Sequence, residues 1–326
     1  MRRVSRTPTF EDVREAASRI DDAVLRTPAW SSDRLDAAVG CHVVLKCENL
    51  QRAGAFKIRG ATNAIRALLG TGATVRGVAA HSSGNHAQAV ALAARENGLP
   101  AAILMPQDAP EEKLAATRAY GAEVVPYDRY REERTTLAAG IAEERGFALI
   151  PPYEHPDVIA GQGTAALELL EDAGPLDALV VPVGGGGLLA GSALAVSAIA
   201  PATRVIGVEP EVADDARRSL EAGSIVHVPT APTICDGQQA PIGELTLAVF
   251  GPVVDRVVAV PADAVRAAMR MLFEAAKVVT EPSGASGLAG VLRHGEDLGL
   301  HGARVGIVLS GGNVSPERFA SLVEGA

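Results

Sequence analysis

The regular alternation of short apolar segments with longer helical segments constrains the fold of this chain more than any other feature. The segments expected to form strands in the first half are Val43–Glu48, Val75–Ala80, Ala101–Met105, Glu123–Tyr127 and Phe147–Ile150. The segments expected to form helices there are Thr9–Val24, Lys57–Leu69, Gly84–Glu96, Glu111–Tyr120 and Tyr130–Arg145. Strands that are separated by helices pair in parallel, because a parallel neighbour is reached only by a long crossover. The sequence therefore predicts an α/β protein.

The segment Pro151-Pro152-Tyr153 interrupts this rhythm and predicts a crossing between two domains. The alternation then resumes, with expected strands or helices at Gly161–Glu171, Ala178–Val183, Leu188–Ala198, Val205–Glu209, Ala262–Ala276 and Arg304–Leu309. Residues 223–256 are rich in Pro, Gly and Thr, so we expect mostly loops there. The prediction is two open, mostly parallel sheets flanked by helices. Residues 77–153 form a small domain, and residues 1–76 and 154–326 form a large one.

Charge and hydropathy exclude several classes of protein. The 326-residue chain has a net charge of −9 with both signs dispersed, so it lacks the basic stripe that binds nucleic acid. The basic start, Met1–Arg6, is not followed by an apolar core, and no stretch is long enough to span a bilayer. Cys41, Cys47 and Cys235 are odd in number and lack metal-ligand spacing. We therefore expect a cytoplasmic protein with reduced, buried cysteines and with neither nucleic acid nor membrane as a partner.

Lysine is scarce in this chain, which makes Lys57 conspicuous. Of 30 basic residues only four are lysines, and the other three are Lys46, Lys113 and Lys277. Arginine stays protonated at any working pH, so it cannot offer a free amine. A lysine that is desolvated among apolar neighbours can lose its proton and attack an aldehyde. Lys57 is therefore a candidate Schiff-base lysine; the alternative is a surface lysine at the start of a helix.

The glycine run Gly184–Gly187 lies between an apolar strand and a helix. Glycines leave the backbone amides bare, and a helix start adds partial positive charge, so this run predicts a phosphate cradle. It lacks the Gly-Lys-Ser/Thr ending of an ATPase loop and the spacing of a dinucleotide fingerprint. The alternative is a flexible turn.

Two further polar segments follow expected strands. Ser82–His86 offers hydroxyls, an amide and helix-start amides, which suit a carboxylate; the alternative is an ordinary helix cap. Leu309–Asn313 ends the last strand, where ligands of open α/β sheets gather; the alternative is a plain turn. A phosphate cradle, a carboxylate loop and a special lysine together predict pyridoxal phosphate (PLP) acting on a small amino-acid substrate.

The order of these motifs resembles the fold-type II (tryptophan synthase β-like) PLP enzymes, in particular the serine/threonine dehydratase and serine racemase group. The resemblance covers nearly the whole chain. The segments that carry it are Gly54–Gly60, Ser82–Gln88, Gly184–Gly187, Glu281–Ala285 and Ser310–Asn313. It implies a large PLP-binding domain, a small mobile substrate-binding domain and a homodimer.

The resemblance also assigns roles to single residues. The positions that match cofactor-binding residues are Phe56, Lys57, Asn85, Gly184, Gly185, Gly186, Gly187, Glu281 and Ser310. Among them, Lys57 matches the Schiff-base lysine, Asn85 the partner of the pyridoxal 3-hydroxyl and Ser310 the partner of the pyridine nitrogen. The positions that match substrate-binding residues are Ser82, Ser83, Asn85 and His86. Lys57 and Ser83 are the expected catalytic residues, because Ser83 matches the serine that faces Cα opposite the lysine in racemases.

A divalent-cation site is implied by the match of Glu209, Ala213 and Asp215. Two carboxylates, a backbone carbonyl and waters suit Mg²⁺ or Ca²⁺. The alternative is a solvated acidic helix start.

Three positions depart from the family pattern. Glu154 stands where Asn or Asp is usual, so contacts to substrate or nucleotide are not carried over to it. Ala87 replaces a glycine at a helix start, and Cys235 replaces a smaller residue.

The function that the resemblance implies is β-elimination from a β-hydroxy amino acid such as L-threonine, L-serine or 3-hydroxyaspartate, giving an oxo acid and ammonia. The alternatives are an amino-acid racemase with side dehydratase activity and a PLP β-replacement enzyme. A further alternative is a binding protein that kept the fold without catalysis, against which Lys57 argues.

Overall fold

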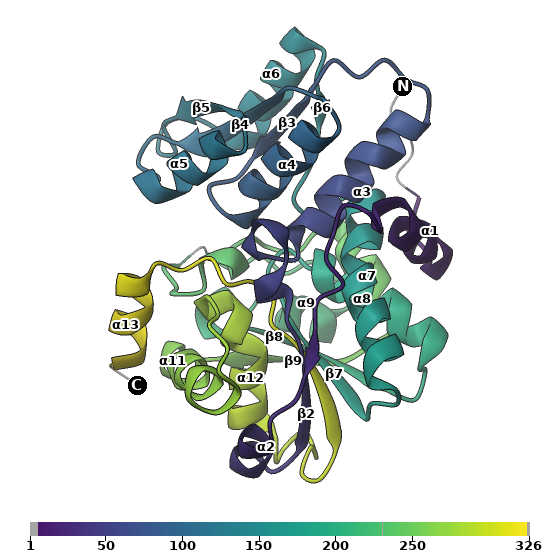
Figure 1. Cartoon of the computed structure of the whole chain (residues 1–326), viewed down its shortest axis with the longest axis vertical. Helices are drawn as coiled ribbons and strands as arrows, with labels where there is room; N and C mark the ends of the chain where they lie inside the picture. The colour runs from purple at the N-terminus through teal and green to yellow at the C-terminus, as the bar shows by residue number, and fades with distance from the viewer. Residues whose placement is uncertain (1–5, 230, 325–326) are drawn as a thin grey trace.

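A computed structural model describes residues 6–229 and 231–324, in which the strands form two separate sheets (Figure 1). The first five residues of the basic start lie outside the described residues. The larger sheet has the order β1-β2-β10-β7-β8-β9. Its strands are β1 Ala29–Trp30, β2 His42–Lys46, β7 Ala178–Pro182, β8 Arg204–Pro210, β9 Val254–Val260 and β10 Arg304–Val308. Only β1 pairs antiparallel to its neighbour, so the expectation of a mostly parallel sheet is confirmed.

The smaller sheet is entirely parallel, with the order β5-β4-β3-β6. Its strands are β3 Val78–His81, β4 Ala101–Pro106, β5 Glu123–Tyr127 and β6 Ala148–Leu149. Figure 1 places it above the larger sheet, with α4 Asn85–Glu96, α5 Glu111–Ala119 and α6 Arg134–Arg145 around it. All four strands lie within the predicted small domain; its limits at residues 77 and 153 stay a prediction.

Helices cover both faces of the larger sheet. One face packs against α2 Asp33–Val39, α11 Ala262–Met271, α12 Pro282–His294 and α13 Pro316–Glu324, through residues such as Leu35, Met269, Leu288 and Leu322. The other packs against α1 Phe10–Ile20, α7 Pro156–Ala173, α8 Gly187–Ile199 and α10 Glu244–Phe250, through residues such as Val13, Leu169, Leu189 and Phe250. No helix among residues 6–229 and 231–324 is long and apolar enough to cross a membrane.

Helix α3, Lys57–Gly70, and helices α7 and α8 approach one another with almost no side chains between them. A Cβ on Gly161 of α7 would lie 2.7 Å from the Cα of Gly60 in α3. A Cβ on Gly163 of α7 would lie 2.6 Å from the carbonyl oxygen of Gly191 in α8. Only glycine allows backbones to come this close. The helix that carries Lys57 and the helix that follows the glycine run are therefore both seated directly on α7.

The expectation that residues 223–256 form mostly loops is confirmed for the described residues. The loops are interrupted by the short 3₁₀ helix Asp236–Gln238, by α10 and by the start of β9. Helix α6 begins at Arg134 rather than Tyr130, because the Glu133 carboxylate caps it by accepting the N–H groups of Thr135 and Thr136. The last helix of the prediction, Ala262–Ala276, ends its α-helical part at Met271 and continues as a π-helix over Leu272–Ala276.

Candidate active site

A cleft with a volume of about 840 Å³ opens between the two sheets. It is lined by every residue that the sequence assigned to cofactor or substrate: Phe56, Lys57, Ser82, Ser83, Asn85, His86, Gly184, Gly185, Gly186, Gly187, Glu281 and Ser310. The segments come from both halves of the molecule.

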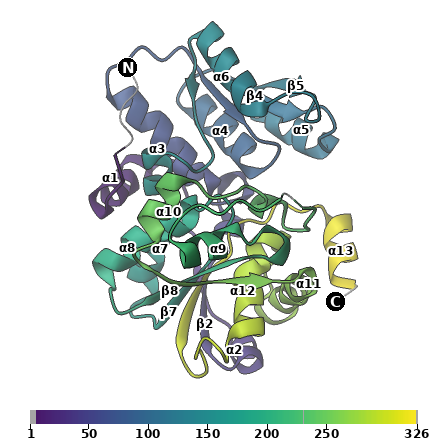
Figure 2. The ribbon, with the colours of Figure 1, turned by 180° about the vertical axis from the view of Figure 1, so that it is seen from behind.

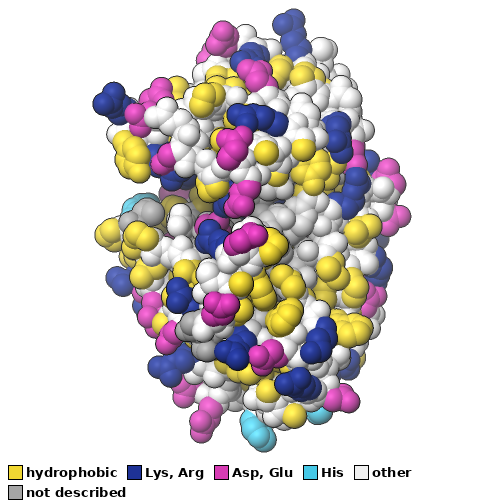
Figure 3. Space-filling model, turned by 60° about the vertical axis from the view of Figure 1, so that its left-hand side comes forward, with side chains coloured by type: hydrophobic (Ala, Val, Ile, Leu, Met, Phe, Trp, Pro, Cys, Tyr) yellow, Lys and Arg dark blue, Asp and Glu magenta, His cyan; other side chains and the backbone are white. Residues whose placement is uncertain are grey.

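On the face of the molecule shown in Figure 3, Lys and Arg side chains are interspersed with Asp and Glu side chains and form no continuous basic stripe.

Lys57 is the first residue of α3, and its amine points into this cleft. Its Nζ donates a hydrogen bond to the carbonyl oxygen of Pro152 at 2.9 Å and lies 5.0 Å from the centre of the Phe56 ring. Burial lowers the pKa of Lys57 to about 8. A substantial fraction of the amine is therefore neutral near physiological pH, as a Schiff-base lysine requires. The reading of Lys57 as an ordinary surface lysine does not agree with this burial.

A buried ion cluster holds the start of α3 in place. The guanidinium of Arg59 is fully buried and donates to both oxygens of Glu48, at 2.7 and 2.8 Å, and of Glu168, at 2.7 and 2.8 Å. Lys46 donates to the same Glu168 carboxylate at 2.6 Å. The cluster joins α3, α7 and the end of β2, and its central residue, Arg59, follows Lys57 by two positions. This cluster could not be predicted from the sequence, because Glu168 lies 109 residues from Arg59.

The glycine run forms a tight turn into α8 that no larger residue could make. Gly186 has a φ of 82°, in the left-handed region, and a Cβ on Gly185 would lie 2.3 Å from Cδ1 of Tyr153. Helix α8 starts at Gly187, so its first amides face the same end of the cleft. This is the geometry of an anion cradle.

Asn85 connects the two halves of the cleft. Its Nδ2 donates to Oε1 of Glu281 at 2.7 Å, and its Oδ1 accepts a hydrogen bond from Nδ2 of Asn313 at 2.9 Å. Burial raises the pKa of Glu281 to about 8. A second connection joins Lys113 in α5 to Asp236, whose atoms Nζ and Oδ2 lie 2.5 Å apart. The role of Asn313 was not foreseen, although it ends the Leu309–Asn313 segment that the sequence singled out.

The Ser82–His86 loop is not the ordinary helix cap that was its alternative interpretation. Helix α4 begins at Asn85 with Gly84 at the cap position and no side-chain cap. Ser82 accepts the N–H of Gly84 at 3.2 Å, and within the described part of the chain the Ser83 hydroxyl makes no hydrogen bond to protein. The His86 ring is buried and its Nε2 bonds to the carbonyl oxygen of Ile150 at 2.9 Å. Burial, assisted by the charge of Lys57, lowers the pKa of His86 to about 3, so the ring is neutral.

Ser310 lies at the end of β10 and is buried. Its Oγ donates to the carbonyl oxygen of Ser283 at 3.3 Å, and its own carbonyl oxygen accepts the N–H of Phe56. The backbone of Ser310 is thus bonded to the residue that precedes Lys57, and Ser310 lines the same cleft as the Ser82–His86 loop.

The residues of the predicted cation site lie outside the cleft lining, and two of them bond to backbone. Glu209 accepts the N–H groups of Ala216 and Arg217 at 3.0 and 2.8 Å and so caps α9, Asp215–Ala222. Oδ2 of Asp215 accepts the N–H of Ile242 at 2.8 Å, and Ala213 belongs to the 3₁₀ turn before α9. Burial raises the pKa of Glu209 to about 8. In residues 6–229 and 231–324 no group of three or more His, Cys, Asp or Glu side chains could hold a metal ion. The cation remains a prediction.

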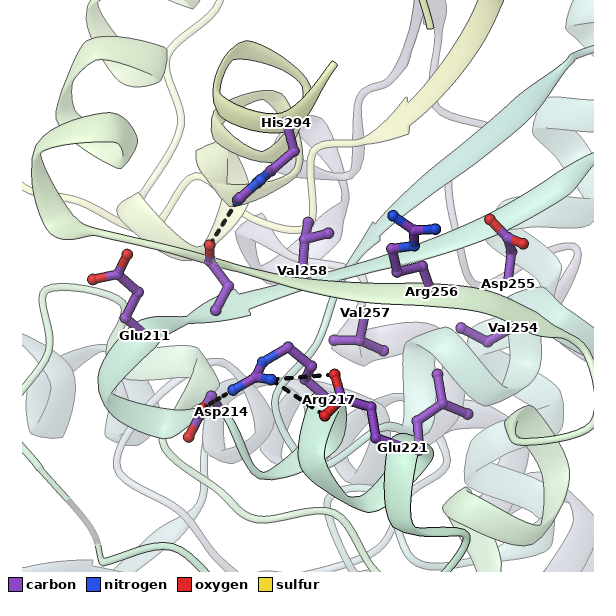
Figure 4. Close-up of a pocket in the computed structure, with 12 residues that line it drawn as sticks. Glu211, Asp214, Arg217, Glu221, Val254, Asp255, Arg256, Val257, Val258 and His294 are labelled. Atoms are coloured by element: carbon purple, nitrogen blue, oxygen red, sulfur yellow. Dashed lines mark hydrogen bonds and ion pairs between the residues drawn. The ribbon is translucent and has the colours of Figure 1, made fainter. Parts of the chain in front are cut away.

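A second hollow lies on the large sheet's side of the molecule, between α9, β9 and α12 (Figure 4). Arg217 and His294, which line this hollow, already have protein partners. Arg217 donates to Asp214 at 2.5 Å and to Glu221 at 3.2 Å, and His294 bonds to the carbonyl oxygen of Ala259. The hollow contains none of the predicted cofactor or substrate residues.

The family whose sequence model is described as "Pyridoxal-phosphate dependent enzyme" matches residues 20–311. The chain belongs to this family. Among similar sequences, an L-threo-3-hydroxyaspartate ammonia-lyase of Saccharomyces cerevisiae is 50% identical over 98% of this chain and 97% of its own. A serine racemase of Schizosaccharomyces pombe is 46% identical over 96% of each chain. The solved structure of maize serine racemase is 43% identical, with a TM-score of 0.92 over 98% of each chain.

The cleft of this pyridoxal-phosphate dependent enzyme fits the cofactor of its family. The cradle at Gly185 and Gly186 has backbone amides at a helix start and no room for side chains, as a phosphate requires. Lys57 supplies an amine that loses its proton readily, and Ser310 supplies a hydroxyl that can turn toward a ring nitrogen. The fold-type II architecture and the PLP cofactor predicted from the sequence are therefore confirmed.

Proposed function

We propose that the protein is a PLP-dependent ammonia-lyase that removes water and then ammonia from a β-hydroxy amino acid, with 3-hydroxyaspartate as the preferred substrate. The observation that carries the proposal is the position of Lys57, whose readily deprotonated amine shares one cleft with the Ser82–His86 loop and the glycine cradle. Two of the relatives that act on L-threo-3-hydroxyaspartate are 50% and 48% identical to this chain.

The chain's own residues have separate tasks in this reaction. The amides and hydroxyls at the start of α4 would bind the substrate carboxylate, and Ser310 would hold the cofactor ring at its nitrogen. When bound, PLP withdraws electrons and makes the Cα proton acidic. Lys57 takes that proton and delivers it to the departing β-hydroxyl, so the Cβ–O bond breaks and water leaves. The resulting enamine hydrolyses to an oxo acid and ammonia, so the water that is lost is consumed again.

A cation in the cleft supports a substrate that has a second carboxylate. Arg134 lines the cleft at the first turn of α6, and its guanidinium has neither an ion pair nor a hydrogen bond with another described residue. The β-carboxylate of 3-hydroxyaspartate could pair with this guanidinium, whereas serine and threonine have no group that could. Arg134→Ala should therefore lower kcat/KM for 3-hydroxyaspartate by about tenfold or more and change that for serine little. Equal losses for both substrates would remove Arg134 from substrate recognition.

Racemisation is the second candidate, and the state of Ser83 favours it. Its hydroxyl lines the cleft without a partner among the described residues, so it is available to return a proton on the face of Cα opposite Lys57. The deciding experiment supplies D- and L-serine, D- and L-threonine and the isomers of 3-hydroxyaspartate, and scores both the oxo acid and the enantiomer of the remaining substrate. An enzyme that produces neither oxo acid nor inverted substrate from any of them would refute both candidates.

A homodimer is also part of the proposal. Four large apolar side chains near the π-helix and the turn after β2 are between 44% and 55% exposed: Trp30, Leu50, Phe273 and Val279. Trp30 bonds to the carbonyl oxygen of Ala276, and Asn49, next to Leu50, bonds to that of Val279, so these residues share one region. Such a group suits a protein partner. Sedimentation of the protein as a monomer at all concentrations would reject it.

A further inference from the structure

The segment Pro152–Glu154, which enters α7 from the small sheet, contacts the active site through two of its three residues. Pro152 accepts the hydrogen bond from Lys57, and the Tyr153 ring packs against Gly185. The Glu154 side chain turns toward α10 instead. Glu154 is also one of the three positions at which the sequence departs from the pattern of the family that it resembles.

The Glu154 carboxylate caps the first turn of α10. Its Oε1 accepts the N–H of Leu245 at 2.5 Å, and its Oε2 accepts the hydroxyl of Thr246 at 3.2 Å and the N–H of Thr246 at 3.4 Å. Gly243, the residue before the helix, leaves the space that the carboxylate occupies, since a Cβ there would lie 2.2 Å from the Glu154 carboxyl carbon. A side chain 91 residues away thus fixes where α10 begins.

The capped turn of α10 forms one wall of the glycine cradle. A Cβ on Gly186 would lie 3.0 Å from Cβ and Oγ1 of the buried Thr246 and 3.3 Å from Cγ2 of Ile242. A second wall is Tyr153, which contacts Gly185. Viewed from behind, α10 lies at the edge of the large-sheet half that faces the small sheet, close to α7 and α8 (Figure 2). Glu154 therefore connects the two walls of the cradle. It follows Tyr153 directly in the chain, and its carboxylate accepts hydrogen bonds from the turn that contains Thr246.

We propose that Glu154 is a positioning residue for the cofactor phosphate: it joins the Tyr153 wall to the Thr246 wall and thereby fixes the cradle in the shape that binds phosphate. Groups that are held in their binding conformation before the ligand arrives bind more tightly, because less ordering is required on binding. The inference concerns cofactor binding alone, so it holds whichever amino acid proves to be the substrate.

The test compares two ligands that differ only in phosphate. Apoprotein is titrated with PLP and with pyridoxal, and binding is followed by the absorbance of the bound ligand. The ratio of the two dissociation constants reports on the cradle, and the melting temperature reports on overall stability. The variants are Glu154→Ala, Glu154→Gln and Gly243→Ala, whose methyl group would displace the carboxylate. Ser32→Ala is the control, because it removes the cap of α2 far from the cleft.

We expect Glu154→Ala and Gly243→Ala to reduce the preference for PLP over pyridoxal by about tenfold or more. Glu154→Gln, which keeps an acceptor oxygen, should lose less than Glu154→Ala. In the Glu154→Ala background, adding Gly243→Ala should cost little more, since both changes remove the same contact. Ser32→Ala should lower the melting temperature without changing the preference. An unchanged preference in Glu154→Gln, Glu154→Ala and Gly243→Ala, or an equal loss in Ser32→Ala, would overturn the proposal; if Glu154→Ala does not fold, the other two variants decide.

Discussion

Removal of Arg59 should destabilise this protein far more than removal of any surface arginine. Its guanidinium and the Glu48 carboxylate are both fully buried, and Glu168 is 14% exposed. Taking one partner from a buried ion pair costs roughly 3–5 kcal/mol, because the other charge stays in a low-dielectric interior. Native proteins are stable by only about 5–15 kcal/mol, so Arg59→Ala should lose a large part of the free energy of unfolding. The same change at Arg118, whose pair with Glu111 is exposed, should cost less than about 1 kcal/mol.

The loss should also depend on pH in a direction that identifies its cause. In the wild type, burial raises the pKa of Glu48 but Arg59 lowers it more, so the net pKa is below its ordinary value. A group with a lowered pKa stabilises the fold above its unfolded pKa, and this contribution disappears as pH falls through the folded pKa. Without Arg59, burial dominates and the pKa of Glu48 rises above its unfolded value. The neutral carboxyl is then favoured in the folded variant. As pH falls from the Glu48 pKa of the folded variant to the Glu48 pKa of the unfolded chain, the difference in free energy of unfolding between wild type and Arg59→Ala should shrink by up to about 1.4 kcal/mol per pH unit.

Urea unfolding of wild type, Arg59→Ala and Arg118→Ala at several pH values, followed by circular dichroism, measures these differences. A deficit for Arg59→Ala below about 1 kcal/mol would refute the argument from burial. A deficit that grows or stays constant toward acid pH would refute the assignment of the cost to an unpaired Glu48.

The remaining predictions concern Lys57, Ser83 and the cation. Lys57→Ala and Lys57→Arg should both abolish turnover and the absorbance of bound PLP, since neither side chain offers a free amine; near-normal activity of Lys57→Arg would contradict this. Because the pKa of Lys57 is lowered to about 8, and only the neutral amine attacks an aldehyde, the rate of PLP incorporation into apoprotein should rise with pH through about 8 and then level off. A flat profile would count against the burial of that amine. Ser83→Ala should leave dehydration of L-substrates largely intact and suppress turnover of D-substrates; an unchanged ratio of the two would remove Ser83 from the catalytic residues. If Glu209 and Asp215 bind Mg²⁺ or Ca²⁺, rigorous chelation should lower the melting temperature and either ion should restore it, whereas identical melting curves would reject the site.

The parallel sheets and the residues of the cleft were predictable because their signals are local. Short apolar runs between helices specify parallel strands, and Lys57, Ser82–His86 and Gly184–Gly187 each stand at a junction of strand or turn with helix. Helix α10 was missed because it has only seven residues and lies among Pro and Gly, where composition predicts loops.

The contacts that position the site could not be predicted, because their partners are distant in the chain. Glu154 caps a helix 91 residues further on, and Asn85 bonds to Glu281, which lies 196 residues away.

Ser83 illustrates the opposite case, in which a local rule fails. A serine before a helix is normally read as its cap, yet the chain places Gly84 there, and no residue in the described part of the chain bonds to the Ser83 hydroxyl.

The glycine contacts of α7 bear on how such an enzyme can be redesigned. Gly161 and Gly163 bring α3 and α8 against one helix at backbone distance, so the spacing between Lys57 and the cradle contains almost no side chain that mutation could shrink or enlarge. Libraries aimed at new substrates should therefore leave this three-helix contact unchanged and vary the rim of the cleft, at positions such as 82, 83 and 134. During evolution, the same contact would allow substrate specificity to change while cofactor binding is preserved.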